Sequence, residues 1–499
     1  MIGTLAIVGA GATGVGAFMA AVQQRIAERI YIIDPQSVGG TVFRTTDDEI
    51  ICNTAVDVTS IDPENEYDFL DYLRCTGHAA SESAYMPRRV FGDYVKSRYY
   101  SAVEKAKQAG IDVKYINGKC EKIEFISKRN YNLILSDWSE RQELRVTDVL
   151  LCTGHGPSKI PRIFEPHSRH PTFFRSPYPE TEMLAKMPTA SDVLIVGSKL
   201  TAVDAALLLC REGHRVTMMS PSGELPSVRS GVPSGSKFPL SESTLKELMS
   251  LWNEEDKLLN YETIKFRYLL YISRILKTID KTPLRKQISF KNEISEKLKE
   301  EIIIAENGSS IWQNFLFSFL NAANSIRMNS QDFKIDIEPN TNHELARYIT
   351  STVLPNAKKI FGFIEKKTLS VEKGHVSDVR LSHKRDKAWN VIWEGGEGRF
   401  DAVVCASGFH NHRYYFDDTG ALVLTGECPS SQASTVDIAS DLSIRHPKTK
   451  EEENIWITGS ATNGRVYVSG AVALAIPQVC MAVNALSNRL NLRDLEICI

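Results

Sequence analysis

Short apolar runs alternate with longer helical stretches along the chain, in two similar series. The first series has the strand TLAIV at 4–8, a glycine-rich turn, a helical stretch, and the strand IYIID that ends at Asp34. The second has DVLIV at 192–196, a turn and helix, and the strand HRVTMMS. Each continues with alternating-pattern strands and closes on an apolar strand with a Thr-Gly or Ser-Gly turn. This order predicts an α/β protein with two nested Rossmann-like dinucleotide-binding domains.

The first turn, GAGATG, has the spacing of a dinucleotide-binding motif. Gly9 permits the tight turn, Gly11 lets the backbone approach a pyrophosphate, and Gly14 lets the helix pack closely on the strand. Asp34, twenty residues after Gly14, is placed to accept hydrogen bonds from a ribose. The alternative is a glycine-rich turn of another α/β fold, which the agreement of spacing and flanking elements disfavours.

The second turn keeps only the first glycine, Gly197. Lys199 takes the second position, and Thr201 with Ala202 takes the third. A side chain at the second position blocks a close backbone approach, although a lysine ammonium can pair with a phosphate as a point charge. An α/β domain that kept its fold and lost its nucleotide is the open alternative.

The second series is longer than the first, and the excess falls at about 236–345, where apolar residues recur at helical spacing. We therefore predict a helical insertion in the second domain, as a possible substrate cap. The expected organisation is a first dinucleotide-binding domain at 1–158, a second at 190–235 and 346–412 around the insertion, and a return to the first domain at 413–499.

Composition limits the possible classes of function. The 499 residues are 42% hydrophobic and 24% charged with a formal net charge of -2, which favours neither nucleic acid nor an anionic membrane as a partner. No uncharged run reaches the ~18 residues of a spanning helix, and no secretory signal pattern precedes the first strand. The nine cysteines contain no CxxC pair, which favours a reduced, cytoplasmic protein and excludes a disulfide reductase.

Several segments together resemble the bacterial FAD-NAD(P)-binding flavoproteins, distant relatives of the lysine and ornithine N-hydroxylases and of Baeyer–Villiger-type monooxygenases. They are IVGAGATG, IIDP, GGTVFRTTDDEIICNTA, YMPRRVFGDYV, CTGHGP, VGSKLTAVD and GHRVTMMSPSGELP. The resemblance covers residues 1–230 and 350–485, whereas the insertion matches nothing in it.

The resemblance implies FAD in the first domain and NADPH or NADH in the second. For the flavin nucleotide it implies contacts from Gly9, Gly11, Gly14, Asp34, Gly40, Thr41, Asn53, Arg88, Thr153, Gly154, Gly459 and Ser460. For the nicotinamide nucleotide it implies Gly197, Lys199, Thr201, Ser220 and Gly408. Pro221 replaces the arginine expected after Ser220 to hold a 2′-phosphate, so the coenzyme preference is open; Arg215 and Lys199 are the possible substitutes.

Two residues are candidates for catalysis. Asn53 follows an apolar pair, where its amide either bonds a flavin edge or serves a turn. His155 follows Cys152-Thr153-Gly154, where it either carries a proton near the cofactor or caps the chain. His410 and His412 have no cysteine or carboxylate at ligand spacing, so no metal site is expected.

The resulting prediction is an FAD-dependent oxidoreductase. The favoured activity is that of an NAD(P)H-dependent monooxygenase, which uses molecular oxygen to hydroxylate a small molecule such as an amino acid or amine. The oxygen step and the substrate follow from the resemblance. The protein supplies binding, orientation and exclusion of water. Two alternatives remain: a flavin oxidase or dehydrogenase that does not use NAD(P)H, and a non-catalytic nucleotide-binding protein. No pattern in the sequence indicates the oligomeric state.

Overall fold

The computed structural model describes residues 3–136, 141–230, 270, 272–277, 283–308, 311–316, 318, 347–382, 388–410, 412, 414–424, 434–462 and 471–497. The described residues form two compact units. Those of unit 1 lie within 1–157 and 409–499, and those of unit 2 lie within 158–323 and 333–408. Most of the insertion predicted at 236–345 lies outside the described residues.

Unit 1 is built on a sheet with the strand order β19-β20-β7-β1-β2-β3. Its strands are β1 (Thr4–Val8), β2 (Arg29–Asp34), β3 (Asp112–Asn117), β7 (Asp148–Leu151), β19 (Ser443–Arg445) and β20 (Glu452–Ile457). All pairings are parallel except that of β19 with β20. The C-terminal segment thus returns to the first sheet through β20, which pairs with β7.

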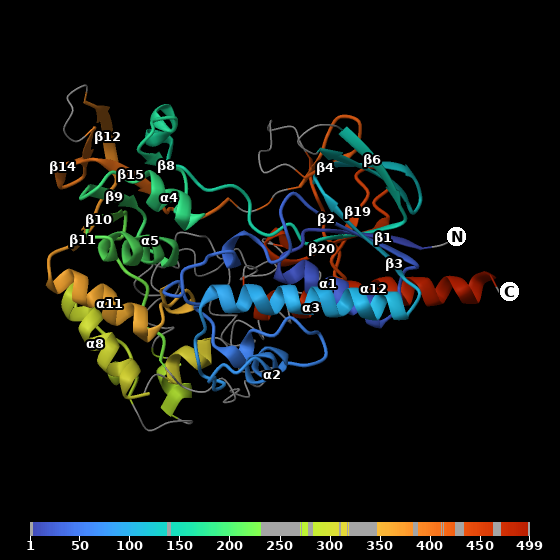
Figure 1. Ribbon diagram of the computed structural model, residues 1–499, viewed down its shortest axis with the longest axis horizontal. Coiled ribbons are helices and arrows are strands. Elements are labelled where there is room, and N and C mark those ends of the chain that lie inside the picture. Colours follow the sequence, from blue (N-terminus) through green and yellow to red (C-terminus); the bar gives the residue numbers. More distant parts are fainter. Residues whose placement is uncertain are drawn as a thin grey trace. The chain divides into compact units, whose positions relative to one another are not determined.

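Helices cover one face of this sheet and a second sheet covers the other. The helices are α1 (Ala12–Gln23), α2 (Asp68–Cys75), α3 (Arg88–Gln108) and α12 (Val472–Ile497). The second sheet has the order β18-β16-β17-β4-β5-β6, with β4 (Lys119–Ser127), β5 (Asn130–Ser136), β6 (Arg141–Val146), β16 (Tyr415–Phe416), β17 (Leu422–Val423) and β18 (Ser434–Thr435). Helix α1 packs against both α3 and α12 (Figure 1).

The apolar run of β1 is buried on both faces, as a strand in the middle of a parallel sheet must be. Leu5 and Ile7 join the core beneath the helices, and Ala6 and Val8 join the core beneath the second sheet. Because side chains alternate between faces, one five-residue strand contributes to both cores. This explains why TLAIV is a continuous apolar run.

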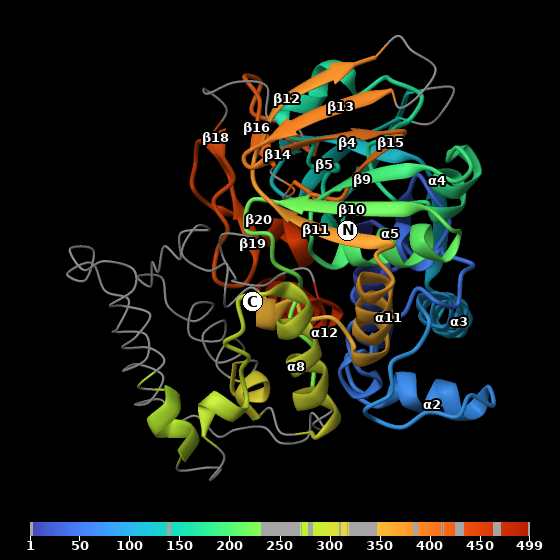
Figure 2. The same cartoon turned by 90° about the vertical axis from the view of Figure 1, so that its left-hand side faces the viewer.

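Unit 2 repeats the plan with a five-stranded sheet of order β11-β10-β9-β15-β8, parallel throughout (Figure 2). Its strands are β8 (Phe173–Phe174), β9 (Asp192–Val196), β10 (Arg215–Ser220), β11 (Leu369–Lys373) and β15 (Ala402–Cys405). A three-stranded sheet contains β12 (Val376–Leu381), β13 (Trp389–Trp393) and β14 (Gly396–Phe400). The helices are α4 (Glu180–Lys186), α5 (Leu200–Arg211), α8 (Ile294–Glu306) and α11 (Leu354–Glu365). The two nested Rossmann-type domains predicted from the sequence are therefore confirmed.

The described part of the insertion contributes to the core of unit 2. Helix α8 packs against α11, and it buries Leu298, Ile302 and Ala305. Trp312 is 1% exposed, as is Phe315. The ring of Trp312 stacks on that of Phe315 at a centroid separation of 6.3 Å and meets the ring of Tyr348 edge-on at 6.0 Å, so these residues are part of the buried interior of unit 2.

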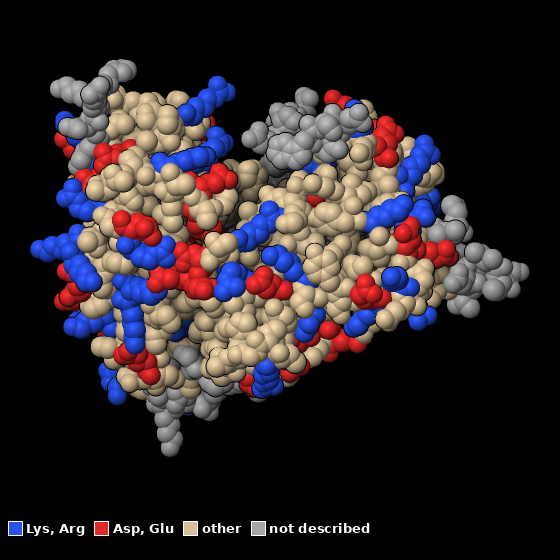
Figure 3. All heavy atoms as spheres, viewed as in Figure 1, with Lys and Arg blue, Asp and Glu red and all other residues tan. Residues whose placement is uncertain are grey.

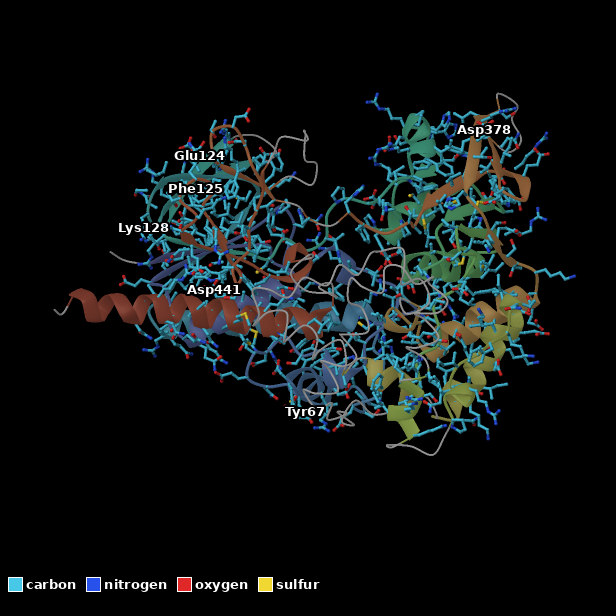
Figure 4. All side chains as sticks on the ribbon, turned by 180° about the vertical axis from the view of Figure 1, so that it is seen from behind. Tyr67, Glu124, Phe125, Lys128, Asp378 and Asp441 are labelled. Atoms are coloured by element: carbon cyan, nitrogen blue, oxygen red, sulfur yellow. The ribbon has the colours of Figure 1, made fainter. Side chains whose placement is uncertain are left out.

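A buried and an exposed ion pair are expected to contribute very differently to the free energy of unfolding. Asp148 of β7 is 2% exposed and accepts bonds from Arg129 Nη2 at 2.8 Å and Asn454 Nδ2 at 2.5 Å. Asp148→Ala leaves Arg129 largely buried without its carboxylate, so we expect a loss of about 3–5 kcal/mol in the free energy of unfolding. Asp378, which lies on the surface (Figure 4), pairs with an exposed Arg380. Asp378→Ala is therefore the control, at ~1 kcal/mol or less. Urea denaturation measures both, and equal losses would contradict the prediction.

Candidate functional site

The first glycine-rich turn joins β1 to α1 and leaves space beside Gly11. Gly9 has φ +110°, and a Cβ there would lie 2.2 Å from the carbonyl oxygen of Cys152. A Cβ on Gly14 would lie 1.9 Å from the carbonyl oxygen of Gly9. A Cβ on Gly11, by contrast, would meet only the Cα of Gly40, at 3.7 Å. Two glycines thus serve close packing of the backbone, whereas Gly11 faces space that a ligand can occupy.

Asp34 anchors this turn from the end of β2. Its Oδ2 accepts a hydrogen bond from Ala10 N at 2.7 Å, and its Oδ1 accepts one from Gln36 N at 2.8 Å. Burial raises the pKa of Asp34, although the same two hydrogen bonds act to lower it. Each carboxylate oxygen can accept a second bond. The residue can therefore hold the turn and still accept a ribose hydroxyl.

A second segment crosses the turn at Gly39 and Gly40. Gly39 N donates to Ala10 O at 3.0 Å, and Gly40 has φ +78°. A Cβ on Gly40 would approach the Cα of Gly11 to 3.2 Å, so the two glycines face each other. Thr41 follows directly and donates through Oγ1 to Gln36 Oε1 at 3.0 Å.

Asn53 and Arg88 lie on the chain that follows. The Oδ1 of Asn53 is buried, and it has no hydrogen-bond partner within the described residues. Arg88 is 7% exposed and begins α3, with its backbone N donating to Ile50 O at 2.8 Å. A buried amide oxygen without a donor fits a ligand N–H, which a flavin ring offers.

The turns after β7 and β20 reach the same end of the sheet as the glycine-rich turn. Gly154 has φ +70°, and its carbonyl oxygen accepts a hydrogen bond from Ser460 Oγ. Gly459 N donates to Gln478 Oε1 at 2.8 Å, while a Cβ on Gly459 would approach Thr13 Oγ1 to 3.7 Å. Thr153 Oγ1 lies 2.5 Å from Tyr414 Oη. Three loops thus meet at the carboxyl ends of the parallel strands, where open α/β sheets bind ligands.

His155 lies beside these loops. Its ring stacks on Phe409 with a centroid separation of 5.6 Å. Burial lowers the pKa of His155, and therefore its imidazole is neutral at pH 7. His412 also has a pKa lowered by burial, with a further contribution from the charge of Lys119.

The second turn, in unit 2, keeps the tight geometry of the first at its start. Gly197 has φ +128°, and a Cβ there would lie 2.3 Å from Ala406 O. Lys199 is the N-cap residue of α5, and its Nζ is buried without a hydrogen-bond partner in the described chain. Burial and the charge of Arg347 lower the pKa of Lys199, while Glu224 acts to raise it. Thr201 lies in the first turn of α5.

The remaining predicted nucleotide contacts of unit 2 do not all gather at this turn. Ser220 Oγ accepts from Ser198 Oγ at 2.8 Å and from Gly223 N at 3.0 Å, so it organises the loop after β10. Gly408 has φ +92° and accepts a bond from Lys159 N at 2.9 Å. Arg215 begins β10, about 16 Å of strand from Ser220, and pairs with Asp192 at 2.6 Å. Its position does not support a contact with a nucleotide bound at the turn.

A cavity of about 390 Å³ follows β10 in unit 2, and sequence reasoning missed the residues that line it. Its ionisable lining residues are Glu224, Lys297, Glu301, Arg347 and Lys373. They come from the loop after β10, from α8, from the segment before α11 and from the end of β11. The four-residue spacing of Lys297 and Glu301 places both on one helix face, which is the one signal that could have indicated them.

Comparison with known proteins finds a similarity in the first part of the chain. A family model described as FAD-NAD(P)-binding matches residues 6–156. No curated protein matches the sequence significantly. In the part of the chain that the structure describes, no helix has an apolar stretch long enough to cross a bilayer.

Solved structures share the fold at low sequence identity. Ornithine hydroxylase from Pseudomonas aeruginosa aligns with a TM-score of 0.58 at 12% identity, over 98% of this chain and 100% of that chain. The ornithine N-hydroxylase of Kutzneria sp. 744 aligns with a TM-score of 0.60 at 11% identity, over 98% and 100%. L-lysine 6-monooxygenase from Pseudomonas syringae aligns with a TM-score of 0.53 at 13% identity, over 98% and 99%. Residues 6–156 therefore match the FAD-NAD(P)-binding family model, in a chain whose fold is similar to that of the ornithine and lysine hydroxylases.

Proposed function

We propose that the protein is an FAD-dependent oxidoreductase that holds FAD in unit 1. The observation that carries this proposal is the space beside Gly11 at the N-terminus of α1. The loops that follow β1, β7 and β20 lie at this end of the sheet. Helix N-termini favour phosphate through their free N–H groups and dipole. Because Gly11 and Gly40 pack against each other and neither has a side chain, a pyrophosphate could approach the backbone of both.

The residues around this space have distinct proposed roles. Gly9 and Gly14 shape the turn, Gly11 and Gly40 admit the phosphates, and Asp34 accepts a ribose hydroxyl. Asn53 offers its unpartnered Oδ1 to an N–H of the ligand. Neutral His155 can accept a proton from a substrate or return one to it. FAD, when bound, supplies the electron transfer that none of these side chains can perform.

Unit 2 is proposed to hold the nicotinamide nucleotide at the turn of Gly197 and Lys199. Its support is the repeated strand–turn–helix geometry of β9 and α5, together with a buried ammonium group that lacks a partner. The Kutzneria enzyme of the same fold was solved with reduced FAD, NADP⁺ and L-ornithine. By this analogy of fold, we propose NAD(P)H-dependent hydroxylation of a small amine or amino acid with molecular oxygen.

The visible spectrum of the purified protein tests the flavin, and anaerobic addition of NADPH or NADH tests the coenzyme. We expect the absorption of oxidised flavin to be present, and to bleach with one of the two nucleotides. Oxygen consumption that depends on an added amine then tests hydroxylation. A colourless protein that binds no added FAD would refute the proposal. Bleaching by substrate alone would replace it with an oxidase or dehydrogenase.

A further inference from the structure

The cavity of unit 2 lies where the sheet topology would place part of a nucleotide. It is lined by the loop that follows β10 and by Lys373 at the end of the neighbouring strand, β11. Parallel α/β sheets bind their ligands at the carboxyl ends of such strands. A volume of about 390 Å³ is also within the range of ligand pockets, and larger than a single ion needs.

Both carboxylates of the cavity already have cationic partners. Lys297 Nζ lies 2.9 Å from Glu224 Oε1, and Arg347 Nη2 lies 3.0 Å from Glu301 Oε1. Burial acts to raise the pKa of Glu224, but the bond from Lys297 and the nearby positive charges lower it overall. Glu224 is therefore ionised at neutral pH. The pairs with Glu224 and Glu301 therefore occupy Lys297 and Arg347.

One lysine of the cavity lining remains in excess over these pairs. Lys373 lines the cavity, and neither an ion pair nor a hydrogen bond of its ammonium group is found within the described residues. Its stem lies against the loop, because a Cβ on Gly223 would fall 2.6 Å from Lys373 Cβ. Lys199, whose buried Nζ has no partner among the described residues, lies at the start of α5 and is not one of the residues that line the cavity. The unmatched charge of the cavity is positive.

We propose that this cavity binds a phosphoryl group of a nucleotide, with Lys373 as its contact and with Lys297 on the inserted helix α8 holding Glu224 away from it. Lys373 would then take the role of the arginine that is expected where Pro221 stands, and the insertion would take part in nucleotide recognition through Lys297. This inference rests on the proposed second nucleotide site. It assigns to residues of the insertion and of β11 a role that no motif in the chain indicates.

Isothermal titration of the full chain tests the proposal with four probes: adenosine 2′,5′-bisphosphate, ADP, adenosine and inorganic phosphate. We expect Lys373→Ala to weaken binding of a phosphorylated adenosine about tenfold, as one lost charge-assisted contact does. Lys373→Glu should weaken it further, and binding of adenosine should not change. Lys366→Ala removes an exposed lysine at the C-terminal end of α11 and is the matched control.

The probes also identify the phosphoryl group. If the Lys373 variants lose affinity for adenosine 2′,5′-bisphosphate alone, Lys373 contacts the 2′-phosphate. If they also lose affinity for ADP, Lys373 contacts the 5′-phosphates. Unchanged affinities in both Lys373 variants would overturn the proposal, as would phosphate binding as tightly as the nucleotides. Failure of NAD(P)H to reduce the flavin would refute the proposed function separately, because these titrations do not depend on electron transfer.

Discussion

Gly11→Val is expected to give a folded protein that purifies with little or no flavin. Gly11 has φ -75° and ψ -173°, which valine adopts without strain. Its Cβ would make only an ordinary contact with Gly40 Cα at 3.7 Å, while the two methyl groups would occupy the space proposed for the pyrophosphate. Since 1.4 kcal/mol already changes affinity tenfold, we expect flavin affinity to fall by about tenfold or more. The ratio of flavin to protein absorbance measures this, and circular dichroism checks the fold.

Two glycine variants separate loss of the ligand from loss of the fold. Gly362→Val changes a glycine of α11 with nothing within 4 Å of its added Cβ, and should keep both flavin and stability. Gly14→Ala places a methyl group 1.9 Å from Gly9 O, and should lower the melting temperature because backbone must move. Full flavin content in Gly11→Val would place the FAD elsewhere. An unfolded Gly11→Val would show that the space beside Gly11 is not open.

Lys199→Met is expected to stabilise the protein while weakening its affinity for a nicotinamide nucleotide. An ammonium buried without a hydrogen bond costs stability, and methionine fills a similar volume, so we expect a gain of about 1–3 kcal/mol. If Lys199 pairs with a coenzyme phosphate, the contact is worth about 1.5–3 kcal/mol, which is a loss of about 10- to 150-fold in affinity. Thermal unfolding and the coenzyme concentration dependence of anaerobic flavin reduction measure the two effects.

The pH dependence of the stability gain gives a further check. The folded state lowers the pKa of Lys199, so folding disfavours its protonated form. In the wild-type protein, Lys199 therefore destabilises the folded state fully at pH values below its lowered pKa. This destabilisation decreases above that pKa and disappears as the pH approaches the ordinary pKa of lysine. Lys199→Met should therefore increase the free energy of unfolding most near neutral pH and least at alkaline pH. The exposed control Lys366→Met should not increase it at either pH. Reduced stability of Lys199→Met would contradict an unpaired buried ammonium.

Local sequence was sufficient to predict the elements around both turns. The closely spaced glycines of GAGATG follow an apolar strand. This pattern predicts a tight strand–turn–helix unit in which α1 packs directly on β1. The structure has this geometry, with Gly9 and Gly14 in backbone contacts that exclude any side chain. The repeated series likewise predicted a second such domain, because hydrophobic periodicity reports which faces of each element are buried. Roles assigned to Asn53 and His155 remain predictions.

The tertiary structure determined which charged side chains form ion pairs. Arg215 was a possible phosphate contact in the sequence, but parallel pairing of β10 with β9 places it beside Asp192 at the end of the strand remote from the turn. The pairs of Glu224 with Lys297 and of Glu301 with Arg347 join residues 46 to 73 positions apart. No local pattern encodes such distances, since they depend on how the insertion packs on the sheet. The chain by itself thus determined the two nucleotide-binding folds, whose signals are local and periodic, while packing between distant segments determined which cations remain free for a ligand.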